Sequence, residues 1–180
     1  MLENEKKDAT DFGKEIIPES IDKYKVCSYQ YDGYWTDIGN IYSFFEANIG
    51  LTQDIPDFNL FDNNNAIYTR ARMLPPAKIS GSTLEKTIIA EGSIINASRV
   101  ENTVVGIRSR IGNGTTVVNS YLMGNDYFET IAEINWSRAH GHPSLGIGDR
   151  CYIKNAIVDK NVRIGDDVRI NGGPHLENCD

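Results

Sequence analysis

A six-residue repeat that begins near Ile79 constrains the fold of this chain more than any other feature of its sequence. An aliphatic residue returns at every sixth position, with occasional steps of five, on both sides of an interruption at residues 125–144. The series comprises Ile88, Ile94, Val100, Val105, Ile111, Val117 and Met123, and then Ile147, Ile153, Val158, Ile164 and Ile170. Neither an amphipathic helix nor an alternating strand has this period, which is typical of a parallel β-helix built from hexapeptides.

In such a fold each hexapeptide forms one side of a triangular coil, and its aliphatic residue points into the shaft. Glycine often follows the aliphatic position, as at Gly106, Gly112, Gly124, Gly148 and Gly165. We expect glycine there because the corners strain the backbone. The period predicts a parallel β-helix over about residues 79–171, with these side chains inward: Ile94, Val105, Ile111, Val117, Ile153, Val158 and Ile164. In the interruption, helical spacing of apolar residues predicts a loop or short helix at one corner.

Upstream of the repeat, the pattern predicts a small α+β region. The β-prone stretch Tyr24–Gln30 precedes an Asp32-Gly33 turn, which indicates a strand. A helical stripe follows, with Asn40 as its N-cap and Gly50 as its stop. Its apolar members are Ile38, Ile41, Tyr42, Phe45 and Ile49. Residues 54–65, rich in Asp, Asn and Pro, predict a surface linker.

Charge and cysteine content exclude several classes of protein. The chain has 25 acidic and 18 basic side chains, a net charge of -7, which opposes binding to nucleic acid or to an anionic membrane. No apolar run is long enough to cross a bilayer, and the charged N-terminus is unlike a signal peptide. Cys27, Cys151 and Cys179 are far apart in sequence, so reduced thiols in a cytoplasmic protein are expected.

Five strings in this chain resemble, in order, the ADP-glucose pyrophosphorylases (glucose-1-phosphate adenylyltransferases) of bacteria and plants. They are DFGKEIIP from Asp11, YDGYWTDIG from Tyr31, IYTRARMLPP from Ile67, VVGIRSRIG from Val104 and IVDKNVRIG from Ile157. The resemblance implies three parts: the end of a nucleotidyltransferase catalytic domain over residues 1–53, a linker over 54–78, and a left-handed β-helix over 79–180. It also implies a fragment, because the glycine-rich nucleotide loop of the family's N-terminal half has no counterpart here.

The same resemblance implies chemistry at the YDGYWTDIG string. Family members make ADP-glucose and pyrophosphate from ATP and glucose 1-phosphate in glycogen or starch synthesis, with Mg²⁺ as cofactor. Asp37 would be a catalytic, metal-binding carboxylate, and Tyr34 and Trp35 would bind substrate by shaping the sugar pocket. Read from the residues alone, Asp37 could equally cap the helix that follows it. With half of the metal site absent, we expect this chain to be inactive alone.

A second group of residues is expected to bind an anionic phosphate effector. The resemblance implies that Arg70, Arg72, Asp159 and Lys160 line an allosteric site between the catalytic domain and the β-helix, in a homo-oligomer that is a tetramer when complete. Arg and Lys suit phosphate oxygens, although isolated basic side chains are most often solvated surface charge. Arg70 stands where many plant and cyanobacterial members have Gln, so the identity of the effector is open.

Two other functions are compatible with a hexapeptide β-helix. One is an acyltransferase, in which a histidine on a loop such as that of His140 and His142 removes a proton from the substrate. The other is a structural module used only for assembly. The YWTDIG string before the coils argues against an acyltransferase, and the small, Gly- and Pro-containing loop around the histidines is more typical of a solvent loop.

Overall fold

The computed structural model describes residues 11–173, and the chain divides into two compact units, Met1–Tyr34 and Trp35–Asp180. In the first unit, a π-helix, η1 (Phe12–Ile16), runs directly into helix α2 (Ile17–Lys23). The Asp11 side chain caps η1 by accepting a hydrogen bond from the Lys14 backbone nitrogen at 2.9 Å. The strand expected at Tyr24–Gln30 is not formed: this stretch is exposed and has no regular structure, so that prediction was wrong. β-prone residues make a strand only where a second strand offers hydrogen-bonding groups, and none of the described strands pairs with this segment.

Helix α3 (Ile41–Gly50) opens the regular structure of the second unit and packs on the β-helix. Its N-cap is Asn40, as predicted, whose side chain accepts a hydrogen bond from the Ser43 backbone nitrogen at 2.8 Å. Phe44 meets Tyr121 edge to face, with ring centroids 5.2 Å apart. Ile49 is buried, whereas Ile38, Ile41 and Tyr42 of the predicted stripe are exposed, so only part of that stripe faces the coils.

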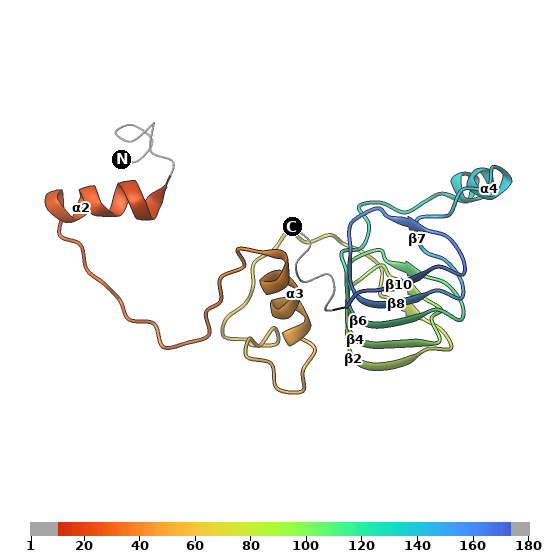
Figure 1. The fold of residues 1–180 in the computed structure, drawn as a ribbon, viewed down its shortest axis with the longest axis horizontal. Coiled ribbons are helices and arrows are strands. Elements are labelled where there is room, and N and C mark those ends of the chain that lie inside the picture. Colours follow the sequence, from red (N-terminus) through yellow and green to blue (C-terminus); the bar gives the residue numbers. More distant parts are fainter. Residues whose placement is uncertain (1–10, 174–180) are drawn as a thin grey trace. The chain divides into compact units, whose positions relative to one another are not determined.

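The repeat region forms the parallel β-helix that its period predicts (Figure 1). Short strands build one five-stranded parallel sheet in the order β1 (Lys78–Ile79), β3 (Ile94–Ile95), β5 (Arg110–Ile111), β7 (Gly146–Ile147) and β9 (Arg163–Ile164). Longer strands build the other, in the order β10 (Arg169–Asn171), β8 (Tyr152–Val158), β6 (Thr116–Leu122), β4 (Arg99–Val105) and β2 (Thr83–Ile89). Each strand pairs with its counterpart in the neighbouring coil, so every inner coil is covered on both sides.

The inward positions form stacked aliphatic ladders. Six of the seven predicted inward residues pack in the shaft or against it: Val105, Ile111, Val117, Ile153, Val158 and Ile164. The prediction that Ile94 points inward was wrong, because β3 pairs Ile95 with Ile111 and leaves Ile94 beside the outward Arg110. Ile95 is 0% exposed and takes the place expected for Ile94. Two other positions differ by one residue from the predicted ones. Ile89 and Leu122 lie on the ladder of Val105, where the spacing had indicated Ile88 and Met123.

An asparagine ladder fills the bend in the middle of the longer strands. Asn102, Asn119 and Asn155 have φ of 46°, 44° and 51°, a left-handed conformation that Asn tolerates better than most residues. The Asn102 side-chain amide donates to Asn119 at 2.7 Å, and Asn119 donates to Asn155 at 2.8 Å. The Thr52 hydroxyl, just beyond α3, donates to the Asn102 side-chain oxygen at 2.7 Å. The ladder therefore links the end of α3 to the coils.

Close packing of coils explains Gly106 and Gly112, whereas Gly124 has a φ of 82° and so shows the expected backbone strain. A Cβ on Gly106 would lie 2.4 Å from the Met123 carbonyl oxygen, although Gly106 has no positive φ. Gly112 is similar, since its Cβ would meet the backbone of Gly148 at 2.5 Å. Glycine is needed here because the backbone of the next coil occupies the space of a side chain.

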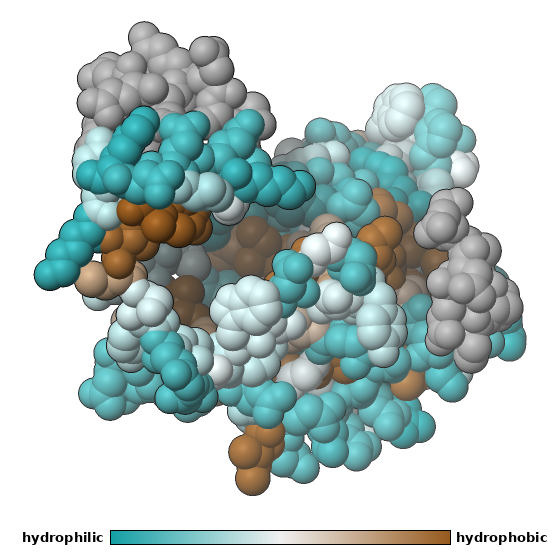
Figure 2. All heavy atoms as spheres, turned by 60° about the vertical axis from the view of Figure 1, so that its left-hand side comes forward, coloured by the Kyte–Doolittle hydropathy of each residue, from teal (hydrophilic) through white to brown (hydrophobic). Residues whose placement is uncertain are grey.

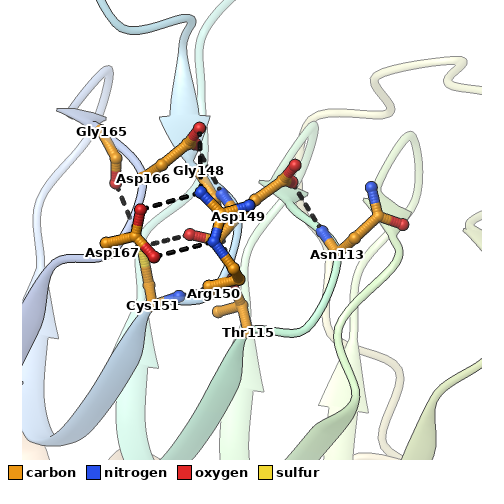
Figure 3. A network of polar contacts seen from close by, with 9 residues as sticks. All are labelled: Asn113, Thr115, Gly148, Asp149, Arg150, Cys151, Gly165, Asp166 and Asp167. Carbon is orange, nitrogen blue, oxygen red and sulfur yellow. Dashed lines mark hydrogen bonds and ion pairs between the residues drawn. The ribbon is translucent and has the colours of Figure 1, made fainter.

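Charged side chains tie successive coils together at another corner (Figure 3). The Asp166 carboxylate accepts a hydrogen bond from the Asp149 backbone nitrogen at 2.8 Å. Arg150 makes a two-point contact with Asp167, at 2.7 and 2.8 Å. These groups are solvent-exposed, so their main effect is to fix the geometry of the turn.

The interruption of the repeat forms helix α4 (Ile131–Ala139), which projects from the shaft near β7 (Figure 1). A capping box starts it: Thr130 accepts from the Glu133 backbone nitrogen at 3.2 Å, and Glu133 accepts from the Thr130 backbone nitrogen at 2.7 Å. The Arg163 guanidinium and the Glu129 carboxylate, 2.6 Å apart, hold the base of this insertion to the coils. A loop or short helix was predicted here, and this prediction is confirmed.

Candidate functional site

The segment that carries Asp37 is exposed and lies between the first unit and α3. Asp37 does not cap α3, since Asn40 does so, and the alternative role of Asp37 as a helix cap is wrong. The exposed fractions of Tyr34 and Trp35 are 41% and 76%, so both present aromatic surface to their surroundings. No helix within residues 11–173 has the length and apolar character needed to cross a membrane.

The face shown in Figure 2 consists mostly of hydrophilic side chains, with hydrophobic ones gathered in separate spots.

Asp37 fits Mg²⁺ as a contributor of one ligand. Residues 11–173 contain no group of three or more His, Cys, Asp or Glu side chains that could hold a metal ion. Magnesium is commonly held by one or two carboxylates, with water and substrate phosphates filling its other positions. A single exposed carboxylate is compatible with that role but is not a complete site.

A denser group of polar contacts lies where β8 ends, around Lys160. The Lys160 ammonium lies 3.1 Å from the Asp126 carboxylate. Asn161, the next residue, donates from its side-chain amide to the same carboxylate at 2.8 Å and accepts from the Asp126 backbone nitrogen at 2.9 Å. Asp159 accepts a hydrogen bond from the Lys160 backbone nitrogen at 2.7 Å, which stabilises the turn. We call Arg72, Asp126, Lys160 and Asn161 the Lys160 cluster.

Arg72 belongs to this cluster although it is far from Lys160 in sequence. Hydrogen bonds from Asn161 and Lys160, together with the positive charges of Lys160 and Arg72, hold the pKa of Asp126 below its ordinary value. Of these influences, the charge of Arg72 has the smallest effect on the Asp126 carboxylate. Arg70 is exposed, two residues before Arg72.

The Lys160 cluster also borders the strand face on which α3 packs. Burial raises the pKa of Tyr121, and the charge of Lys160 partly offsets this increase. The Tyr121 ring is the one that Phe44 of α3 contacts edge to face. Tyr121 therefore contacts the helix that follows Asp37 and also experiences the charge of Lys160.

The histidines of the insertion lie in a different environment. The Trp136 ring stacks on His140 and on His142, with centroids 4.3 and 5.7 Å apart. His142 also lines a pocket of about 660 Å³ that includes Trp136 and Arg163. His140 Nδ1 lies 2.8 Å from the Trp136 carbonyl oxygen, so this ring is engaged with its own helix.

The two arginines of the VVGIRSRIG string lie in different surroundings. Arg108 contacts the Asn125 carbonyl oxygen at 3.4 Å, and its guanidinium lies 5.6 Å from the centre of the Phe128 ring. Arg110 is exposed on β5. Arg108 therefore contacts the base of the insertion.

Asp126 and Asn161 are the residues of the Lys160 cluster that the sequence did not predict. Asp126 stands where the repeat breaks, so no period marks it.

Comparison with known families assigns the two ends of the chain. Residues 72–180 match the family model described as the GLGC left-handed parallel beta-helix domain. Residues 1–54 match the family model described as nucleotidyl transferase. The described coils are those of such a β-helix, and the two matches, in this order, fit an ADP-glucose pyrophosphorylase. The chain therefore belongs to the ADP-glucose pyrophosphorylase family, and its repeat region is a left-handed parallel β-helix.

Proposed function

We propose that this chain serves in the synthesis of ADP-glucose from ATP and glucose 1-phosphate, and that its β-helix carries the binding site for an anionic effector. The proposal is supported by the match of the coils to the GLGC β-helix domain and by the exposed Lys160 ammonium at a coil corner of a chain whose net charge is -7. Basic side chains gathered on an acidic protein would create a local anion site. Together with the nucleotidyl transferase match, this favours a regulated sugar-nucleotide enzyme.

In this proposal Asp37 contributes one carboxylate ligand to Mg²⁺. The ion would offset the charge of the phosphate groups during adenylyl transfer. Trp35 and Tyr34 would form walls beside the sugar, because exposed aromatic rings present a rigid surface at small entropic cost. In the complete enzyme, Asp37→Asn should lower kcat by orders of magnitude while leaving the fold intact.

The effector site would use Arg72 as a fork for phosphate oxygens and Lys160 as a point charge. Asp159 supports the turn through its contact with the Lys160 backbone. Arg70, exposed nearby in sequence, would extend the site toward a larger phosphate ester. Contact through Tyr121 and α3 offers a route by which effector binding can influence the segment of Asp37.

Phosphate binding to the purified chain tests the proposal directly. Titration with inorganic phosphate at low ionic strength should show binding that Lys160→Met and Arg72→Gln each weaken by roughly tenfold, since a charge-assisted hydrogen bond is lost. Lys78→Met, an exposed charge on β1, removes the same charge elsewhere and should have little effect. Equal weakening by all three variants would indicate nonspecific attraction and would contradict an effector site.

The assembly module remains the second candidate, favoured by the long stack of parallel coils. Homo-oligomers are common among such folds, and we propose a tetramer for the complete enzyme. The two functions differ in their response to phosphate, because an assembly module should bind no effector. In either case we expect no pyrophosphate release from ATP and glucose 1-phosphate by this chain alone.

A further inference from the structure

Asp126 is a negative charge placed inside a site proposed to bind anions. Its carboxylate lies 3.1 Å from the Lys160 ammonium, at the distance that a ligand phosphate oxygen would need. It also feels the positive charge of Arg72. The Lys160 cation is therefore already paired with a group of the protein itself.

The carboxylate is held by contacts that do not depend on Lys160. Asn161 donates to one carboxylate oxygen at 2.8 Å, and the Asp126 backbone nitrogen donates back to the Asn161 side-chain oxygen at 2.9 Å. Asn161 is itself fixed at a coil corner, with a φ of 58°. Lys160 is the more mobile partner, because its long, half-exposed side chain ends in a freely rotating ammonium group.

We propose that Asp126 is a built-in counterion that competes with the anionic effector for Lys160 and thereby sets the affinity of the site. This inference rests on the proposed function. When a phosphate binds, Lys160 leaves Asp126 for the ligand, while Asn161 keeps the carboxylate in place. The bound phosphate then lies close to a fixed negative charge, so each added charge on the ligand increases the repulsion.

The competing view is that Asp126 positions Lys160 and so assists binding. The two views predict opposite signs for one substitution. Asp126→Asn retains the size of the side chain and an oxygen that can accept from Asn161, but it removes the charge. If Asp126 competes, this variant should bind phosphate roughly three- to tenfold more tightly at low salt, and the gain should shrink as salt is added.

The experiment is a titration of the purified chain with inorganic phosphate at fixed pH, repeated at low and high ionic strength. The variants are Asp126→Asn, Asp126→Ser, Lys160→Met and the double variant Asp126→Asn with Lys160→Met. Asp57→Asn is the matched control, because it removes one exposed negative charge from the linker. Circular dichroism checks that each variant retains the coils.

Tighter binding by both Asp126 variants, with no gain for Asp57→Asn and none in the double variant, is the expected result. Unchanged or weaker binding by Asp126→Asn and Asp126→Ser, with binding still lost in Lys160→Met, would overturn the counterion role and leave the effector site standing. Identical behaviour of the unaltered chain and Lys160→Met would overturn the effector site, and the counterion role with it.

Discussion

The β-helix and the segment of residues 24–40 are both rich in β-prone residues, yet only the first forms strands. In the β-helix, the partner of each strand is the equivalent strand of the next coil, and so the repeat itself supplies the hydrogen-bonding edge. In the second region every residue is exposed, including Tyr29 and Trp35. A regular period therefore provides each strand of the coils with a partner, whereas β preference in residues 24–40 meets no partner among the described strands.

The largest expected effect comes from an inward residue of the coils. Ile95→Ala should lower the free energy of unfolding by about 2 to 5 kcal/mol, because a fully buried aliphatic side chain is lost and the stacked coils cannot close the cavity. Ile111→Ala belongs to the same ladder and should behave alike. Denaturant unfolding followed by circular dichroism measures both.

The neighbouring Ile94 is the matched control for this register. It points outward beside Arg110, so Ile94→Ala should cost much less than Ile95→Ala. Equal losses of unfolding free energy for Ile94→Ala and Ile95→Ala would contradict the pairing of β3 with β5, and with it the statement that the inward side chains provide the stability.

The asparagine ladder gives the next largest effect. Asn119→Ala removes a donor and an acceptor from the ladder. Alanine also lacks the polar side chain that helps asparagine to adopt a φ of 44°, so a loss of roughly 2 to 4 kcal/mol is expected. Asn119→Gly loses the same hydrogen bonds without the steric strain and should cost about 1 kcal/mol less. A glycine variant that is as stable as the native protein would show that the ladder matters only for its backbone conformation.

A glycine at a coil contact should respond oppositely to one in a helix. Gly106→Ala places a methyl group against the Met123 carbonyl oxygen, with an expected cost of about 1 to 3 kcal/mol. Gly50→Ala, at the end of α3, meets no atom within 4 Å and should stabilise the protein by up to about 0.5 to 1 kcal/mol. Thermal unfolding of both variants compares them, and a neutral Gly106→Ala would mean that the coils can separate at this point.

Much of the β-helix could be predicted from the sequence because its period is local. The errors occurred at Ile88-Ile89 and Ile94-Ile95, where two adjacent aliphatic residues fit the spacing equally well and only strand pairing decides between them. At Leu122-Met123 the same ambiguity favoured the wrong residue. The period thus identifies each coil, but it does not show which of two adjacent aliphatic residues points inward.

The candidate site was less predictable. Arg72 and Lys160 were placed together by family resemblance alone, and their common site stays a prediction. Asp126 itself lies at the start of an insertion, where neither period nor family string marks it. The expected strand at Tyr24–Gln30 failed for the opposite reason: its residues have strong β preference, but hydrogen bonds between strands cannot be predicted from one strand alone.

The smallest expected effect concerns the contact between the two packed parts of the second unit, α3 and the coils. Burial raises the pKa of Tyr121 in the folded protein, so the folded state holds the phenol proton more tightly than the unfolded state does. This contribution to stability is complete below the unfolded pKa of about 10 and is lost as pH rises through the folded value.

Tyr121→Phe keeps the ring that meets Phe44 but cannot ionise. Unfolding free energies measured from about pH 9 to 11 should therefore fall more steeply for the native protein than for Tyr121→Phe. Tyr29→Phe, at a site that is 87% exposed, is the matched control and should follow the native curve. Parallel curves for all three proteins would indicate that α3 leaves the Tyr121 hydroxyl open to water, and that the helix is held to the coils by the Thr52 contact and Ile49 instead.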